Sequence, residues 1–404
     1  MKIVSLMLSI LICGIAQAQS QFYMKANNWF DGSEFHINET VFIKVSKGVI
    51  DSISTSIPSK KEKLIDIKDD VLIPGLIDGH THVLFEDATN GKDFQKALIA
   101  NLHMNRKKRK KEGEKVLQAY LESGFTTLID LGNSGEFIDL ELRNRKPRVM
   151  VSGPGISVEK AQFSKESSLS DVSKEYLIID FSKNINEQLR IYKEKKVDFI
   201  KVYADNDPGL GIMSVEQLKI IKKWCDENNF QLHVHSEESP SIKRALDAKA
   251  DYIHHVYDLD EEILNRLDSS TSILVPTYSG WALKDYISET REINGPFLNQ
   301  KKLLKSGHAA FGSDAYFKIP QMDRGQQALE SLISLTKWGL STSEILKLAT
   351  SNWNVKFMKR PIGVIQKFAV ADFIVVDHEI LKSIEGLRKI KMVFFKGKKA
   401  HEKH

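Results

Sequence analysis

The feature that most constrains this fold is a regular alternation of short apolar runs with helix-like amphipathic stretches along the middle of the chain. Apolar strands separated by helices are typical of a parallel sheet wrapped by helices. Eight candidate strands can be counted, which is the number that closes an α/β (β/α)₈ TIM barrel. They cover residues 76–82, 125–130, 148–152, 198–203, 230–235, 252–255, 272–276 and 308–313.

Helix starts support this alternation. Ser214 with Gln217 and Ser341 with Glu344 have the spacing of capping boxes, and each pair precedes an apolar-periodic stretch. The sequence therefore predicts helices that begin at these two points.

Both ends of the chain carry short alternating segments of a different kind. The clearest of them cover residues 41–45, 49–53, 373–376 and 392–395. The first two flank a Ser-Lys-Gly turn and predict a β-hairpin, and the last two predict strands around a glycine turn. We expect residues 19–73 and 362–404 to combine into a small β-sandwich beside a barrel of residues 74–361, which suits a chain of 404 residues.

The start of the chain has the pattern of a secretory leader. An apolar run over residues 3–15 is followed by Ala16-Gln17-Ala18, the small residues that precede a cleavage site. We predict a signal peptide over residues 1–18 and a periplasmic or secreted protein, with no membrane insertion after cleavage because no apolar run is long enough. A lipid anchor at Cys13 is the weaker alternative, since the residue before it is not small.

Charge and cysteine content exclude other classes. A net charge of +5 with 27% charged residues gives no reason to expect a nucleic-acid partner. The basic cluster at residues 106–111 is interpreted as a solvated helix face. Cys225 is the only cysteine outside the leader, so no intramolecular disulfide is expected, and it is interpreted as a small buried apolar residue. A homo-oligomer is left open.

Polar residues that can bind metal occur at the ends of the predicted strands. His80 and His82 lie two residues apart on a strand, so both side chains can point into the barrel from the same face of the strand and bind one ion. Imidazole nitrogen is a common ligand of zinc and of its neighbours in the first transition row. Barrel active sites are assembled at this end of the strands. The later candidates in chain order are Lys201, then His233 or His235, then His254 or His255, and finally Asp314.

This ordered set resembles the amidohydrolase superfamily of metal-dependent hydrolases, and within it the imidazolonepropionase-like and Xaa-Pro dipeptidase-like branch. The resemblance extends over residues 22–397 and rests on the segments 72–82, 124–132, 199–202 and 242–255. Counting back from the last segment without a gap makes His235, rather than His233, the ligand on the fifth strand.

The resemblance implies a site with two divalent metal ions, taken as Zn²⁺, that are bridged by a carboxylated Lys201. One ion would be held by His80, His82 and Asp314, and the other by His235 and His255. A lysine ammonium inside an apolar strand is costly, whereas a neutral amine can add carbon dioxide and form an anion that the cations stabilise. An unmodified Lys201 beside a single metal stays open.

The resemblance also implies the reaction: hydrolysis of a carbon–nitrogen bond in a small amide, cyclic amide or dipeptide. A metal-activated water would attack the carbonyl carbon, and Asp314 would act as general base and then as general acid toward the leaving nitrogen. An esterase or lactonase with the same centre, and a catalytically silent relative that binds a small ligand, are the alternatives. His233, His254 and Tyr203 are secondary candidates, the first two as packed or supporting residues and the third as a substrate contact.

The loops depart from the family pattern. The Gly-Gly-His loop expected after the third strand is replaced by residues 152–157 without a histidine, so the relatives' substrate cannot be carried over. Residues 365–372 replace another usual glycine turn. The polar segment 153–182 exceeds an ordinary barrel connection and is expected to include a loop over the barrel mouth. Substrate and metal identity are not determined by the sequence.

Overall fold

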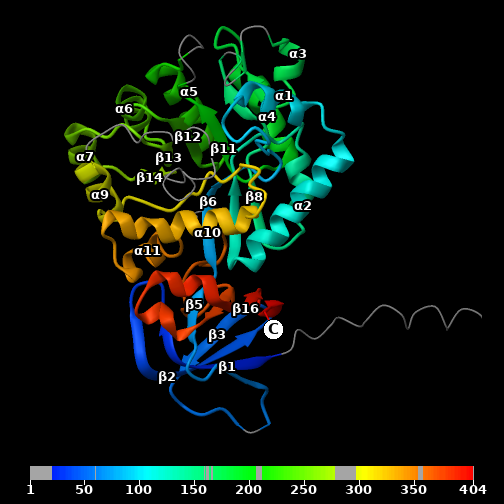
Figure 1. Ribbon diagram of the computed structural model, residues 1–404. Helices are drawn as coiled ribbons and strands as arrows, with labels where there is room; N and C mark the ends of the chain where they lie inside the picture. The colour runs from blue at the N-terminus through cyan, green and yellow to red at the C-terminus, as the bar shows by residue number, and fades with distance from the viewer. Residues whose placement is uncertain are drawn as a thin grey trace, which may run out of the picture.

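The computed structural model describes residues 21–403 except for 60, 159, 161–162, 165–166, 206–211, 278–296 and 354–357. Figure 1 shows a larger lobe of strands and helices above a smaller lobe built mainly of strands. The leader predicted at residues 1–18 lies outside the described residues. Within the described part of the chain, no helix combines the length and the hydropathy that crossing a membrane requires.

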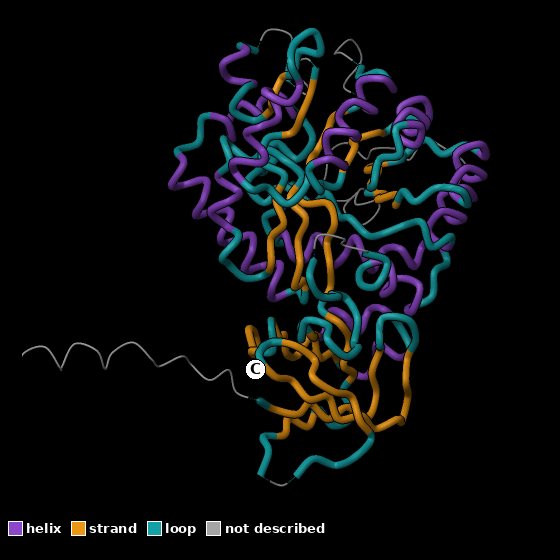
Figure 2. The backbone as a smooth tube through the Cα atoms, turned by 180° about the vertical axis from the view of Figure 1, so that it is seen from behind, coloured by secondary structure: helices purple, strands orange, loops and turns teal. Residues whose placement is uncertain are grey.

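The larger lobe contains parallel strands in two hydrogen-bonded sheets, and Figure 2 shows the helices around them. The first sheet has the order β6 (Leu76–Thr81), β7 (Phe125–Asp130) and β8 (Arg148–Val151). The second has the order β10 (Tyr176–Ile178), β9 (Gly155–Ser157), β11 (Ile200–Tyr203), β12 (Leu232–Ser236), β13 (Tyr252–His255) and β14 (Ile273–Pro276). Seven of the eight predicted strands are therefore confirmed, with ends shifted by two residues or fewer.

Backbone hydrogen bonds connect the two sheets. Asp198 N, just before β11, donates to Val151 O of β8 at 2.9 Å. Leu274 N of β14 donates to the His308 carbonyl oxygen at 2.7 Å, and Gly79 N of β6 donates to the Phe311 carbonyl oxygen at 3.1 Å. Residues 308–313 therefore lie between β14 and β6.

The segment predicted as the eighth strand is not a regular strand. It makes one isolated parallel bridge, between Leu274 and Ala309. Its backbone then turns to the left-handed conformation at Asp314, with φ of 49°, and a residue in that conformation cannot continue a strand. The fold is α/β and TIM-barrel-like, and the complete eight-stranded barrel stays a prediction.

Helices follow most of these strands and cover their outer side (Figure 1). Both predicted capping boxes are confirmed, at Ser214 with Gln217 and at Ser341 with Glu344. Cys225 is buried, as predicted. The helices are α1 (Phe94–Leu102), α2 (Arg106–Glu122), α3 (Leu169–Val172), α4 (Ile185–Lys195), α5 (Val215–Glu227), α6 (Ser239–Asp247), α7 (Glu261–Leu267), α9 (Phe297–Lys305), α10 (Arg324–Ser334) and α11 (Thr342–Leu348).

The smaller lobe joins the two ends of the chain in one sheet. The order is β17 (Lys398–Glu402), β16 (Ile390–Phe395), β15 (Phe373–Val376), β5 (Val71–Pro74), β1 (Phe22–Phe30), β2 (Phe35–Ser46) and β3 (Val49–Ser54), with β4 (Leu64–Asp66) paired to β1. Strand β5 pairs antiparallel with β15, so the terminal segments combine as expected. The two-layered sandwich itself stays a prediction.

One connection in this lobe is the one that the sequence predicts, and another differs from the prediction. The predicted hairpin is β2 with β3. Strands β15 and β16 pair antiparallel, but two short 3₁₀ helices join them, η3 (His378–Leu381) and η4 (Ile384–Lys389). The glycine turn lies after β16, where Lys396 and Gly397 both have positive φ and lead into β17.

The long segment 153–182 contains β9, α3 and β10 in its described part, so it is more than a loop. Phe163 and Tyr176 from this segment pack in one apolar cluster with Tyr203 and Tyr316. The segment therefore rests on side chains that also border the cavity described below.

The basic cluster at residues 106–111 was predicted to be a solvated helix face, and this is wrong for Arg109. Its side chain is buried, and its guanidinium donates to Leu84 O at 3.0 Å, to Asn133 O at 2.6 Å and to the Glu175 carboxylate at 2.5 Å. Glu175 lies 66 residues away in sequence. Helical periodicity could not show this partner, because it comes from another part of the fold.

We expect Arg109→Met to lower the free energy of unfolding by about 3–5 kcal/mol, because the substitution leaves the Glu175 carboxylate buried without its cation. Urea denaturation followed by circular dichroism measures the change. The matched control is Lys107→Met on the exposed side of the same helix, which should change stability by roughly 0.5 kcal/mol or less. Equal effects of the two substitutions would contradict a structural role for the buried pair.

Candidate metal centre

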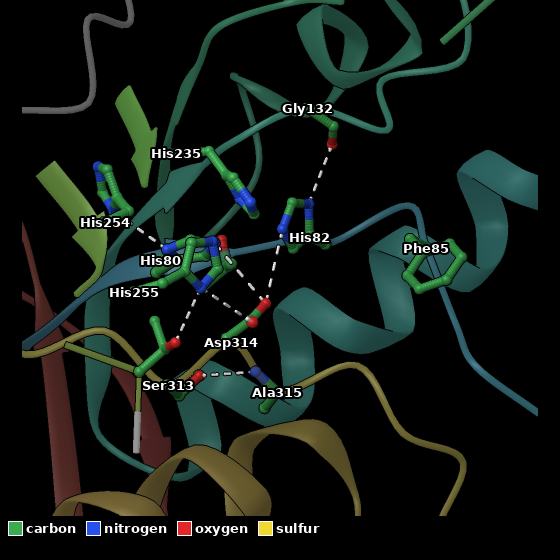
Figure 3. A network of polar contacts seen from close by, with 12 residues as sticks. His80, His82, Phe85, Gly132, His235, His254, His255, Ser313, Asp314 and Ala315 are labelled. Carbon is green, nitrogen blue, oxygen red and sulfur yellow. Dashed lines mark hydrogen bonds and ion pairs between the residues drawn. The ribbon is translucent and has the colours of Figure 1, made fainter. Parts of the chain in front are cut away.

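All six residues predicted to bind metal line one cavity, although they come from segments spread over more than half of the chain. Figure 3 shows Asp314 among the histidines of this set. They lie on or just after strands β6, β11, β12 and β13 and after the segment 308–313. The six are His80, His82, Lys201, His235, His255 and Asp314. The TIM-barrel-like arrangement therefore brings them together at the carboxyl ends of parallel strands, where such folds place their sites.

Asp314 lies among three imidazoles. Its Oδ1 is 3.7 Å from His80 Nε2 and 3.6 Å from His82 Nε2, and its Oδ2 is 3.8 Å from His255 Nδ1. Donors that bind one zinc ion at about 2.0–2.1 Å in tetrahedral geometry are separated by roughly 3.4 Å. The spacing of these atoms therefore fits donors around one ion, and His80, His255 and Asp314 form a candidate metal-binding group.

A second group surrounds His235. The His235 and His255 rings have centroids 4.3 Å apart, and His235 Nε2 lies 3.4 Å from Asp205 Oδ1 and 3.7 Å from Glu237 Oε1. Donor atoms of His235, Glu237 and His255 lie close enough together to hold an ion. Sequence reasoning missed both carboxylates. Asp205 lies two residues after Tyr203, and Glu237 lies two residues after His235. Their position just beyond a predicted strand end could have identified them.

Lys201 is buried with 1% of its surface exposed, and its Nζ has no hydrogen-bond partner among the described residues. The ammonium nitrogen lies 5.3 Å from the ring centre of Tyr203. Burial lowers the pKa of Lys201 from 10.5 to about 7. The neutral amine is therefore accessible near neutral pH, which is the form that carbon dioxide modifies.

The backbone around Asp314 is held against β6. Asp78 Oδ1 accepts hydrogen bonds from His80 N at 3.1 Å and from Ser313 N at 2.9 Å. Asp314 N donates to His80 O at 2.9 Å. Gly312 is required by this close approach, since a Cβ there would lie 2.6 Å from His80 Cβ. Asp78 lies within the segment 72–82, but the sequence pattern gave it no role.

Backbone strain also marks the site. Asp314 and His255 both adopt left-handed backbone conformations, with φ of 49° and 75°. Residues other than glycine rarely do so, and such strain persists where the surrounding structure imposes it, often at functional sites.

Neighbouring groups orient the imidazoles. His82 Nδ1 lies 3.4 Å from Gly132 O. His80 Nδ1 lies 3.0 Å from His254 Nδ1. Such contacts fix which ring nitrogen faces a metal. Burial and neighbouring cations hold the pKa of His80 well below its usual value, and the pKa of His82 is lowered to about 3, so both are neutral and can donate a lone pair.

The secondary candidates separate into two kinds. Tyr203 lines the cavity, as expected of a substrate contact. His254 and His233 are fully buried and do not line it, as expected of packed residues. The remaining cavity wall was not foreseen, because it comes from connecting segments without a local motif; it consists of Phe85, Phe94, Asn133 and Tyr316.

Known structures with low sequence identity share this fold. The A. niger ochratoxinase is 20% identical with a TM-score of 0.79, and the match covers 95% of this chain and 96% of that one. A Xaa-Pro dipeptidase with methionine bound in its active site is 18% identical with a TM-score of 0.75, covering 95% and 100%. At these identities the structural likeness shows the architecture alone, an α/β TIM-barrel-like fold.

Sequence comparison gives the family. An imidazolonepropionase from Thermoanaerobacter pseudethanolicus is 24% identical over 370 residues, covering 84% of each chain. The family model described as "Amidohydrolase family" matches residues 71–400. The chain therefore belongs to the amidohydrolase family, as the resemblance predicted, and it is a hydrolase that acts on carbon–nitrogen bonds.

Proposed function

We propose that this protein is a metal-dependent hydrolase that cleaves a carbon–nitrogen bond in a small amide, cyclic amide or dipeptide. The observation that carries the proposal is the convergence of His80, His82, His235, His255, Lys201 and Asp314 on one cavity. The likeness to an imidazolonepropionase and to a Xaa-Pro dipeptidase supports a small substrate, and the second name favours dipeptides.

The donor set fits divalent metal. Four imidazoles and a carboxylate suit zinc, and the buried His80 Nε2 has no hydrogen-bond partner in the described part of the chain. We propose that His80, His82 and Asp314 hold one Zn²⁺ and that His235 and His255 hold a second. Carboxylated Lys201 would bridge the two ions. A single ion beside unmodified Lys201 is the alternative.

When bound, divalent ions would polarise the substrate carbonyl and favour ionisation of water. Asp314 performs the proton transfers. Its carboxylate takes a proton from the attacking water and passes it to the leaving nitrogen, which would otherwise depart as an unstable anion. Both carboxylate oxygens face imidazoles in the cavity, and this supports the proposed role.

The cavity wall supports an apolar group on the substrate. Phe85, Phe94 and Tyr316 contact one another with ring centroids 5.4–6.2 Å apart, and all three border the cavity. Tyr316 also meets His82 edge to face at 6.3 Å. An apolar substituent placed against these rings would exclude water beside Asp314.

The remaining sequence-based assignments belong to the same proposal. The leader over residues 1–18 would export the protein to the periplasm or beyond. Residues 74–361 would form the closed barrel, with residues 308–313 in the position of its eighth strand. Residues 19–73 and 362–404 would form the appended β-sandwich.

The test is metal analysis combined with a substrate panel. Protein purified without chelator is expected to contain about two equivalents of zinc or a related metal, and to hydrolyse at least one member of a panel of dipeptides, N-acyl amino acids and lactams. Only trace metal would refute the proposal. Faster hydrolysis of matched esters than amides would favour the esterase alternative, and binding without turnover would favour the silent relative.

A further inference from the structure

Three buried histidines form a hydrogen-bonded line that leads away from the cavity. His80 Nδ1 lies 3.0 Å from His254 Nδ1, and His254 Nε2 lies 3.0 Å from His233 Nδ1. All three side chains have no exposed surface. Figure 3 shows His254 on the far side of His80 from Asp314. The line starts at a predicted metal ligand on β6 and crosses β13 to reach β12.

Each contact in this line requires one nitrogen to carry a proton and the other to accept it. A charged imidazole would be costly at such complete burial, so the three rings are neutral and each carries one proton. Only two arrangements then satisfy both hydrogen bonds, and they run in opposite directions. In one, His80 carries its proton on Nδ1; in the other, it carries its proton on Nε2.

Only the first arrangement lets His80 bind metal. The Nε2 atom faces Asp314 in the cavity, so it must keep a free lone pair, and the proton must be on Nδ1. His254 then accepts at Nδ1 and donates from Nε2 to His233. The last proton is on His233 Nε2, which has no hydrogen-bond partner in the described part of the chain.

The far end of the line is apolar. The His233 ring packs against Phe199 and Tyr252 with centroids 4.3 Å and 4.5 Å apart. A metal-binding histidine is commonly supported by a carboxylate or a carbonyl oxygen, which adds negative charge or polarity. Here the support is a neutral imidazole, whose own proton position is set by a further imidazole.

We propose that His254 and His233 are positioning residues that hold His80 in the tautomer able to bind metal, with its proton on Nδ1. The proposal rests on the proposed function, because it concerns how this chain prepares its metal ligand. His254 acts directly on His80, and His233 acts through His254. Metal binding therefore selects the arrangement in which His80 donates to His254 and His254 donates to His233.

The first test measures Zn²⁺ affinity by competition with a chromophoric chelator, on variants shown to be folded by circular dichroism. His254→Phe removes the acceptor and should weaken zinc binding about 10–100-fold. His254→Gln retains an acceptor oxygen and should recover most of this loss. His233→Phe should weaken binding by a smaller factor. Phe199→Leu, which alters the apolar packing on His233 but removes no hydrogen-bonding atom, is the control and should bind like wild type.

The second test reads the proton positions directly, by ¹⁵N NMR of the imidazole rings in zinc-loaded protein labelled at histidine. His254 should carry its proton on Nε2 and not on Nδ1. A proton on Nδ1 of His254 would overturn the proposal even if His254→Phe fails to fold. If folded His254→Phe binds zinc as tightly as the wild-type protein does, this inference alone is overturned. If the wild-type protein binds no zinc, the proposed function is overturned as well.

Discussion

The Asp314→Asn enzyme is expected to lose turnover by about 100-fold or more while its fold is retained. The amide that replaces the carboxylate cannot accept the proton of the attacking water, and general acid–base groups contribute about 10²–10⁴ in rate. The fold should persist because Asp314 has φ of 49°, a left-handed conformation that asparagine also tolerates well. Measurement of kcat together with circular dichroism checks both parts.

Metal content must be measured on the same samples, because Asp314 is also a proposed ligand. Turnover is therefore compared per metal-loaded protein. The matched control is Asp268→Asn at an exposed position after α7, which should leave kcat unchanged. A folded, metal-loaded Asp314→Asn enzyme with a kcat within threefold or so of wild type would refute the assigned role.

The second large effect is expected at Lys201. Lys201→Met removes the group that would carry the bridging carboxylate, so bound metal should fall from about two equivalents to one or fewer, and turnover should fall with it. Without metal, the Lys201→Met protein should be more stable than wild type near pH 7 by roughly 1–3 kcal/mol, because an apolar side chain replaces a buried amine that lacks a hydrogen bond. Metal analysis, kcat and urea denaturation measure these three changes.

The pH dependence of this stability follows from the lowered pKa. Between pH 7 and 10.5 the unfolded chain keeps the Lys201 proton while the folded chain has lost it, so the stability of metal-free wild type should rise with pH across that interval. Lys201→Met should lack this contribution, whereas Lys219→Met at an exposed position should keep it. Two equivalents of metal in Lys201→Met would contradict the bridging carboxylate, and one equivalent in wild type would favour the single-metal alternative.

Much of this protein was accessible from local sequence patterns. Strands such as β7 and β13 were predicted with their observed ends, because short apolar runs between helices are fixed by burial over a few neighbouring residues. The six proposed ligands were found because each lies on or just after a short apolar run. Their convergence follows from parallel topology, which places all of these strand ends on the same side.

Other features depend on partners that are distant in sequence. Arg109 is buried because Glu175 meets it from 66 positions away. Residues 308–313 make one isolated bridge to β14, and the chain then turns at Asp314, whose backbone N–H donates to His80 O. The His80–His254 contact joins residues 174 positions apart. The sequence by itself determined which side chains could bind metal and on which strands they lie. Only the tertiary structure decided how they are oriented and what supports them, because those interactions depend on atoms that folding alone brings within a few ångströms.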